Sequence, residues 1–318
     1  MPSDSRRVVA RNVLTMTAFK AGFISVLGRP NAGKSTLFNF ILGEKIAITS
    51  DKPQTTRHRI LGIRNMEGAQ LIFLDTPGIH DGRSKLNRRM VSTAVAAGRD
   101  ADVILFLVDA SAPLVEADRQ MMGSVAESRG VPFLVINKID LVRKELLLPL
   151  MDRYRRLHAF EQIIPVSALT GDGVLLLLEE ILKFLPESPP YYPDDMITDQ
   201  TERSLVSEII REKLIEQSYQ EIPFSTAVTV EAFKEDPEKN LVTIRASIHV
   251  ERDSQKKIVI GRGGQKLKMI GSAARREIEA MLERKVFLEL WVSVEKDWTQ
   301  DGRALDRLGY PRRPLSEE

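Results

Sequence analysis

Short apolar runs alternate with longer, partly polar stretches through the first part of the chain. Between residues 19 and 185, runs of strand length end in polar or glycine-containing turns, and segments with helical spacing lie between them. The runs cover residues 23–27, 71–74, 103–108, 133–136 and 163–166. This order predicts an α/β domain with a mainly parallel sheet and helices on both faces. Such folds bind ligands at the carboxyl ends of their strands.

A proline-rich stretch separates this region from a second pattern. Residues 186–200 contain four prolines, which remove backbone donors and disfavour helix, so a linker is predicted there. A helical segment over residues 201–220 follows, then alternating strands over 224–233 and 241–250. Two helical stretches flank residues 261–264, and a last strand covers 286–294. The order α-β-β-α-α-β predicts an α+β domain over residues 201–318.

Composition excludes several kinds of site. The 318 residues contain no cysteine, which excludes disulfides, thiolate metal sites and a cysteine nucleophile, and the four histidines are scattered. With 46 Lys and Arg against 44 Asp and Glu, the net charge is +2, so a polyanion site has to be a local patch. The longest apolar runs fall far short of the ~18 residues of a membrane span. Residues 1–18 are predicted to be a disordered extension, with a targeting peptide or a start at Met16 as alternatives.

The first predicted strand ends in a phosphate-binding sequence. Residues 28–35 read GRPNAGKS, which matches G-x-x-x-x-G-K-[ST] between a predicted strand and a predicted helix. Its glycines let backbone N–H groups wrap the phosphates, and the helix N-terminus favours an anion. We expect Lys34 at the β- and γ-phosphates and Ser35 at Mg²⁺; a glycine-rich turn with a chance Lys-Ser pair is the alternative. The residues predicted to bind the phosphates are Gly28, Asn31, Ala32, Gly33, Lys34, Ser35 and Thr36.

The next predicted strand ends in a motif that fits the metal and the terminal phosphate. The residues are Asp75, Thr76, Pro77 and Gly78. An aspartate at this place can hold Mg²⁺ through water, and the amide of Gly78 can sense a γ-phosphate. The same four residues are also a good turn sequence, but their distance after the phosphate loop favours the nucleotide-binding interpretation.

Two later strand ends carry residues suited to a guanine base. Asp140 can accept hydrogen bonds from guanine N1–H and the exocyclic amine, Asn137 can bond the base edge, and the stem of Lys138 can lie over the ring. Adenine lacks that donor pair, and such a mismatch can cost about 10⁴-fold in binding. A polar turn is the alternative. Three further residues suit a backbone amide for guanine O6: Ser167, Ala168 and Leu169.

These motifs, in this order, resemble the G domain of the TRAFAC small GTP-binding proteins. The sequence QTTRH at residues 54–58 lies where that family has switch I. The resemblance implies that Thr56 closes over Mg²⁺ and the γ-phosphate; Thr55 and a plain surface loop are the alternatives. It further implies a metal site formed by Ser35, Thr56 and Asp75. The implied catalytic residues are Lys34, Asn31, Thr56 and Gly78.

One position departs from the Ras pattern. Ile79 stands where Ras-like members carry the glutamine that orients the attacking water, so slow hydrolysis is expected. In related GTPases an asparagine at the position of Asn31 coordinates K⁺, which would stabilise charge between the β- and γ-phosphates in the transition state. The alternative is that Asn31 only shapes the loop. His80 is a weaker candidate for positioning water. The basic run from Arg83 to Arg89 is interpreted as a solvated face of switch II, with contact to RNA or a partner as the alternative.

Charge is unevenly distributed in the second domain. Residues 187–251 contain 6 basic and 14 acidic residues, whereas residues 256–276 contain seven basic residues and no acid. Such a block predicts a phosphate-binding face. A G-x-x-G loop at its centre lets a nucleic-acid backbone approach closely; an ordinary packing motif with solvated lysines is the alternative. The predicted RNA contacts are Lys257, Gly261, Arg262, Gly263, Gly264, Lys266, Lys268 and Arg275.

The second domain resembles the type II KH module, whose G-x-x-G loop clamps about four nucleotides of single strand. Trp291 lies in an alternating strand and is expected in the core, although it and Trp298 are also candidates for stacking on bases. The whole arrangement resembles the Era family of ribosome-assembly GTPases over residues 19–310. The resemblance implies slow, Mg²⁺-dependent hydrolysis of GTP to GDP and binding to the 3′ end of 16S rRNA in 30S assembly. It also implies a cytoplasmic monomer with peripheral association at the cell membrane.

Two other functions fit parts of the sequence. One is a signalling switch whose KH-like domain docks to a protein or a membrane surface. The other is a GTP-independent RNA-binding protein with a degenerate G domain. The acid-free basic stretch favours RNA over protein docking, and the intact nucleotide motifs argue against a degenerate G domain.

Overall fold

The protein, represented by a computed structural model, is described for residues 18–50, 52, 55–78, 84–126, 128–218 and 222–310. The first of its two sheets has the strand order β2-β3-β1-β4-β5-β6. All neighbours in it are parallel except β2 and β3. The strands are β1 (Lys20–Gly28), β2 (Ile60–Met66), β3 (Ala69–Asp75), β4 (Val103–Asp109), β5 (Val131–Asn137) and β6 (Gln162–Pro165). The predicted mainly parallel sheet is confirmed, with β2 as an additional strand.

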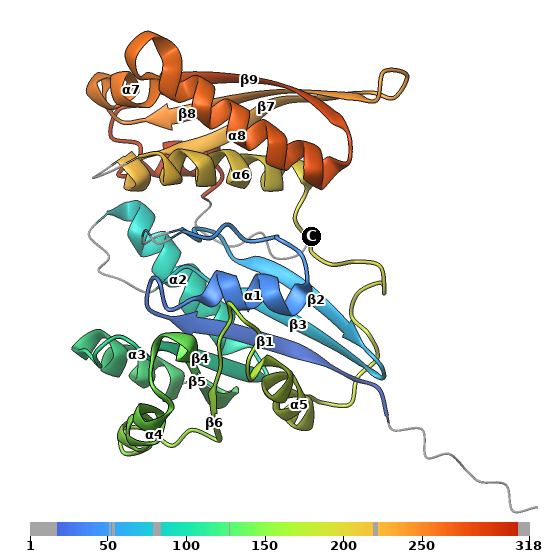
Figure 1. Cartoon of the computed structure of the whole chain (residues 1–318), viewed down its shortest axis with the longest axis vertical. Helices are drawn as coiled ribbons and strands as arrows, with labels where there is room; N and C mark the ends of the chain where they lie inside the picture. The colour runs from blue at the N-terminus through green and yellow to red at the C-terminus, as the bar shows by residue number, and fades with distance from the viewer. Residues whose placement is uncertain are drawn as a thin grey trace, which may run out of the picture.

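Helices cover both faces of this sheet (Figure 1). On one face, apolar residues of α1 and α5 pack on inward residues such as Ile24 and Phe73. On the other, residues of α3 and α4 pack on Phe106 and Ile136. The helices are α1 (Lys34–Leu42), α2 (Lys85–Arg99), α3 (Glu116–Ala126), α4 (Leu147–Arg155) and α5 (Val174–Phe184), with short 3₁₀ turns η1 (Ile139–Leu141) and η2 (Lys144–Leu146).

The second unit is a three-stranded sheet with helices on one face (Figure 1). Strand β8 pairs antiparallel with β7 and parallel with β9. The elements are α6 (Glu202–Glu216), η3 (Ile222–Phe224), β7 (Ala227–Asp236), β8 (Leu241–Val250), α7 (Asp253–Ile260), η4 (Arg262–Gly264), α8 (Gln265–Leu282), β9 (Lys285–Val294) and α9 (Gly302–Arg307). The predicted order α-β-β-α-α-β is confirmed, with η3, η4 and α9 in addition. Among the helices of the described ranges, none has the length and apolar character needed to cross a membrane.

The expectation for Trp291 is wrong. Its side chain is 63% exposed, whereas Trp298 is fully buried and donates from Nε1 to the carbonyl of Ser225. Strand β9 does alternate, but Val292 lies on its inward face. The sequence pattern predicted the alternation of β9 correctly, but the prediction assigned the wrong set of alternate residues to its buried face.

The proline-rich stretch follows the edge of the first sheet. The side-chain amide of Gln70 accepts hydrogen bonds from the backbone of Tyr191 and Tyr192 and donates to the Tyr192 carbonyl. Farther along, the N–H of Ile63 donates to the Ile197 carbonyl at 2.7 Å. The Ile63 bond satisfies a backbone group of the edge strand β2, and together with the Gln70 bonds from β3 it fixes the path of the chain towards α6.

Candidate functional site

The phosphate loop joins β1 to α1 and is shaped by backbone in the left-handed region. Asn31 has φ of 64° and Gly33 has φ of 94°. A Cβ at position 28 would lie 2.4 Å from the Leu107 carbonyl oxygen, so only glycine fits there. The loop therefore curves into a cradle at the N-terminus of α1, and the first N–H groups of a helix are suited to an anion.

Lys34 lies within this cradle. Its ammonium donates to the carbonyls of Gly28 and Arg29, both at 3.0 Å, and the residue is 6% exposed. Burial lowers the pKa of Lys34 to about 8, and the nearby Asp75 carboxylate opposes that shift. A phosphate placed beside Lys34 would add negative charge and stabilise the protonated form.

Three side-chain oxygens from separate segments meet next to the loop. Ser35 Oγ lies 2.8 Å from Thr56 Oγ1 and 2.9 Å from Asp75 Oδ2, and Thr56 Oγ1 lies 3.1 Å from the same carboxylate oxygen. The site contains one carboxylate and two hydroxyls, which suits Mg²⁺ that keeps water and takes further oxygens from phosphates. Thr55 instead donates its hydroxyl to the Lys52 carbonyl at 2.7 Å. Of the two threonines, Thr56 has the geometry for a metal.

The base motifs lie at the ends of β5 and β6, on the same edge of the sheet. Asn137 donates to the Ala32 carbonyl at 2.8 Å and accepts from the Ala168 N–H at 2.9 Å. Asp140 is exposed and accepts from Ser167 Oγ at 2.6 Å. Asn137 thus connects the phosphate loop with the segment that contains Ser167, Ala168 and Leu169, and Asp140 is held with its carboxylate open to solvent.

The motif after β3 also reaches the phosphate loop. Thr76 donates to the Val26 carbonyl at 2.8 Å, and a Cβ at position 78 would come within 3.0 Å of Pro30. Pro77 therefore lies between two anchored residues beside the loop. Ile79, His80 and Arg83 lie outside the described residues.

The G-x-x-G loop forms a sharp turn between α7 and α8. Gly261, Gly263 and Gly264 all have positive φ, and a Cβ at 263 or 264 would meet nothing within 4 Å. The loop backbone is therefore open to a ligand. Of the basic residues predicted around it, Lys266 is half-buried and four are exposed: Lys257, Arg262, Lys268 and Arg275. Burial and, to a lesser extent, the neighbouring Lys52 lower the pKa of Lys266.

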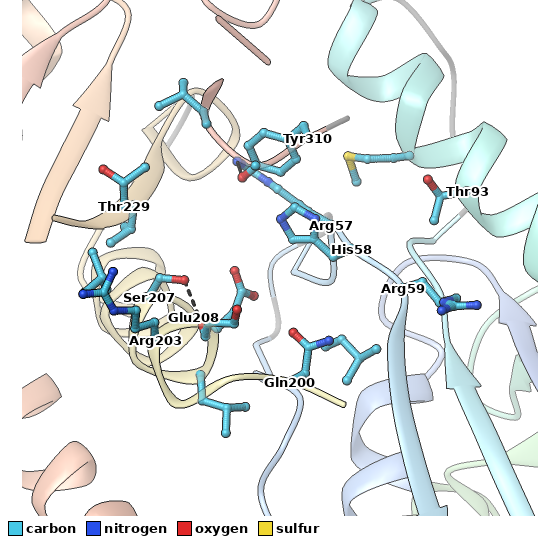
Figure 2. Close-up of a pocket in the computed structure, with 18 of the residues that line it drawn as sticks. Arg57, His58, Arg59, Thr93, Gln200, Arg203, Ser207, Glu208, Thr229 and Tyr310 are labelled. Atoms are coloured by element: carbon cyan, nitrogen blue, oxygen red, sulfur yellow. Dashed lines mark hydrogen bonds between the residues drawn. The ribbon is translucent and has the colours of Figure 1, made fainter. Parts of the chain in front are cut away.

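An interface between the two units contains residues that the sequence did not single out. Arg57, 2% exposed, donates to the carbonyls of Thr226 at 2.6 Å and Pro223 at 2.7 Å. His58 stacks on Tyr310, with ring centroids 4.6 Å apart. A cavity of about 520 Å³ lies beside these side chains and is lined by residues of both units. Figure 2 shows the arrangement of the lining side chains. The sequence contained only part of the information needed to predict these contacts. Arg57 adjoins Thr56, which was predicted as a site residue, but the carbonyls that Arg57 contacts belong to residues more than 160 positions away.

Comparisons with known proteins agree with both halves of this geometry. A family model described as a 50S ribosome-binding GTPase matches residues 23–138, and a KH-domain model matches residues 221–299. GTPase Era of Syntrophus aciditrophicus is 56% identical over 92% of this chain and 95% of its own length. GTPase Era of Geotalea uraniireducens is 53% identical over 93% of this chain and all of its own.

The chain belongs to the Era family of GTPases.

Solved structures of this family superpose on nearly the whole chain. One, of Era in complex with MgGDPNP and nucleotides 1506–1542 of 16S ribosomal RNA, has a TM-score of 0.89 and 41% identity and covers 92% of this chain and 99% of its own. Another, of a variant of Aquifex aeolicus Era bound to GDP and AlF₄⁻, has the same TM-score and identity and covers 92% of this chain. Family membership confirms the GTPase activity and the pairing of a G domain with a KH domain that were predicted from the motifs.

Proposed function

We propose that this GTPase hydrolyses GTP with Mg²⁺ and binds the single-stranded 3′ end of 16S rRNA through its KH domain during assembly of the 30S subunit. One observation carries the proposal. The nucleotide motifs lie together at one edge of the first sheet, and the same chain carries a basic face around an accessible G-x-x-G loop. The Era structure with MgGDPNP and 16S rRNA nucleotides supports both halves, because it superposes on this chain at 41% identity.

The phosphate loop and Lys34 are proposed to bind the triphosphate. Backbone N–H groups of residues 31–36 wrap the β-phosphate, and the Lys34 ammonium moves from two carbonyls to oxygens of the β- and γ-phosphates. Ser35, Thr56 and Asp75 would hold Mg²⁺, which neutralises charge that develops on the phosphates. The Gly78 amide is proposed to donate to the γ-phosphate, because Gly78 packs against Pro30 of the loop.

Guanine selection is proposed to rest on Asp140. Its carboxylate accepts from two guanine donors, while Ser167 fixes its orientation from the side at 2.6 Å. Asn137 holds the backbone of Ala168 in place, so that this segment can present an N–H to guanine O6. The stem of Lys138 covers one face of the base, with its ammonium anchored 2.7 Å from Asp109.

A K⁺ ion is proposed beside Asn31. The left-handed backbone of Asn31 places its side chain at the mouth of the phosphate loop, where the residue is exposed. A cation there would stabilise charge between the β- and γ-phosphates. Because Ile79 supplies no group that can orient water, this charge stabilisation would account for most of the rate.

The basic face is proposed to bind RNA rather than a protein. Arg262, Lys257 and Lys268 are exposed around a loop whose backbone has open space, which favours close contact with phosphates. Lys266 and Lys52 repel each other, and a phosphate between them would relieve that repulsion.

We further propose that the protein acts as a cytoplasmic monomer. Peripheral membrane association is proposed from the family resemblance alone, and flotation with vesicles of anionic lipid tests it.

One measurement tests this function as a whole. The affinity of the protein for a single-stranded RNA with the 16S 3′-end sequence would be measured with a GTP analogue, with GDP and without nucleotide. We expect binding in the presence of the analogue, and a weaker signal for a scrambled RNA. An affinity that is the same for both RNA sequences and in all three nucleotide states would contradict the proposal.

A further inference from the structure

The segment that contains Thr56 is anchored to the second unit on both of its sides. On one side, the carbonyl of Thr55 accepts a hydrogen bond from Arg211 of α6. On the other, the guanidinium of Arg57 donates to carbonyls of residues 223, 224 and 226. Thr56 itself is 5% exposed and contacts Ser35 and Asp75. The hydroxyl proposed to meet the metal therefore lies between two arginine anchors.

Arg211 is held in place by its own helix. Glu208, one turn earlier, accepts from Arg211 Nε at 2.9 Å and from Nη2 at 2.5 Å. Arg211 is 1% exposed, and burying an arginine is costly unless its charge is paired. The pKa of Glu208 lies below its ordinary value although burial alone would raise it, because the guanidinium favours the carboxylate. This buried pair fixes the arginine fork, which then points at one external acceptor, the Thr55 carbonyl.

Other contacts between the second unit and Lys45, Thr49 and Lys52 lie farther from Thr56 along the chain. Glu212 accepts from the Thr49 N–H at 2.9 Å and from Lys45 at 2.5 Å. Lys52 donates to the Ile215 and Ser218 carbonyls. These contacts dock Lys45, Thr49 and Lys52 onto the second unit. Arg211 differs from them because it contacts the peptide group that directly precedes Thr56.

We propose that Arg211 is a positioning residue for the nucleotide site. By holding the Thr55 carbonyl, it keeps the Thr56 hydroxyl beside Ser35 and Asp75, so that the site is preorganised for a triphosphate with its metal. The inference rests on the proposed function, in which Thr56 serves the metal and the γ-phosphate. GDP has no γ-phosphate, so its affinity does not depend on this position.

The test compares nucleotides in variants of the full chain. Arg211→Met combined with Glu208→Gln removes the donor without leaving a buried carboxylate unpaired. We expect it to weaken binding of a fluorescent non-hydrolysable GTP analogue about tenfold, the value of one lost charge-assisted hydrogen bond. GDP affinity should stay unchanged, and more Mg²⁺ should be needed for half-maximal binding of the analogue. Arg211→Lys keeps a donor and should restore part of the affinity; it also serves as the test if the double variant does not fold.

Asp306→Asn is the matched control. This substitution removes the ion pair between Asp306 and Arg89, which joins the two units at 2.6 Å. That ion pair does not involve residues 55–57. The substitution should leave both affinities unchanged. Equal losses for GDP and the analogue, a control that reproduces the selective loss, or no change in the Arg211 variants would each overturn the inference. A wild-type chain that binds neither nucleotide would instead contradict the proposed function.

Discussion

Asn137 lies so close to Gly33 that a Cβ at position 33 would stand 2.1 Å from Asn137 Nδ2. The same side chain bridges the Ala32 carbonyl and the Ala168 N–H. The phosphate loop and the base motif are therefore one packed unit rather than two independent binding elements. A glycine at position 33 is required both by its φ of 94° and by this contact.

Gly33→Ala should consequently weaken GTP and GDP binding strongly while the fold persists. The added methyl displaces Asn137 and breaks both of its hydrogen bonds, each worth about 1 kcal/mol or more when buried. Gly43→Ala is the matched control, because Gly43 also has positive φ, 76°, but a Cβ there meets nothing within 4 Å. Fluorescent-nucleotide titration of both variants checks this. Equal losses in the two would mean that backbone strain, and not the Asn137 contact, determines binding.

Base choice should depend on Asp140. Asp140→Asn keeps an oxygen for the 2.6 Å hydrogen bond from Ser167, so the loop should not move. The new amide cannot accept from both guanine donors, and GTP affinity should fall by about 10³-fold or more. Competition titrations should then rank xanthosine triphosphate above GTP. An unchanged preference for GTP would remove Asp140 from the base site.

Hydrolysis should be faster in K⁺ than in Na⁺. Asn31 has φ of 64°, so alanine would add backbone strain there, and Asn31→Gly is the cleaner replacement. Single-turnover rates in KCl and NaCl should differ in the wild type and converge in the variant, because the variant lacks the side-chain oxygen that would bind the ion. Equal wild-type rates in the two salts would leave Asn31 with a role in loop shape alone.

The nucleotide site could be predicted from the sequence, whereas the buried face of β9 and the presence of β2 could not. The nucleotide motifs are local patterns at strand ends, so spacing and apolar runs were sufficient to find them. The phase of β9 was predicted incorrectly, because both of its faces carry large apolar residues: Phe287 and Trp291 are exposed, while Leu288 and Leu290 pack against the core. Strand β2 was also missed, since only its first half is buried.

The contacts of Arg57 and Arg211 could not be predicted from the sequence for a different reason. Each arginine bonds to carbonyls about 160 residues away in the chain. Backbone carbonyls carry no residue-type signal, so no motif in the sequence reports such a contact. Only the docking of the two units brings these groups together.

The interface between the units should weaken in mild acid. Burial lowers the pKa of His58 to about 4, with Arg211 and Arg57 adding to the shift and Glu208 opposing it. The unfolded chain, with an ordinary pKa near 6.5, binds the proton first, so stability is full above about pH 6.5 and falls as the pH drops towards 4. His58 is half-buried, and the loss should be on the order of 2 kcal/mol.

Urea unfolding at pH 7 and at pH 4.5 measures this effect, with His58→Phe for comparison. Phenylalanine can keep the stack on Tyr310, which has an interplanar angle of 12°, but does not titrate. The variant should therefore lose less stability in acid than the wild type. Identical losses would show that His58 contributes nothing to the acid response.

RNA binding should depend on the G-x-x-G loop and not on charge in general. Replacing Arg262 and Gly263 with aspartate puts negative charge where phosphates should pass. A Cβ at 263 meets nothing within 4 Å, and aspartate is one of the residues that best tolerates the φ of 57° there, so the fold and GTP hydrolysis without RNA should change little. Each lost phosphate contact removes a salt slope of about 0.7 on single strands, and losing two or three should flatten the salt dependence visibly.

Lys285→Asp is the control for diffuse attraction. Lys285 is exposed at the start of β9, at the far end of α8 from the loop, and the 18 residues of α8 span about 27 Å. It should leave RNA affinity and the salt slope nearly unchanged, while the loop variant loses most of its binding. If both substitutions weaken binding equally, the attraction is long-range charge and the G-x-x-G assignment fails. If only the loop variant does, and duplex RNA of equal length competes poorly, the loop is a clamp for single strands, because a duplex keeps its bases stacked and its backbone too stiff to enter so narrow a turn.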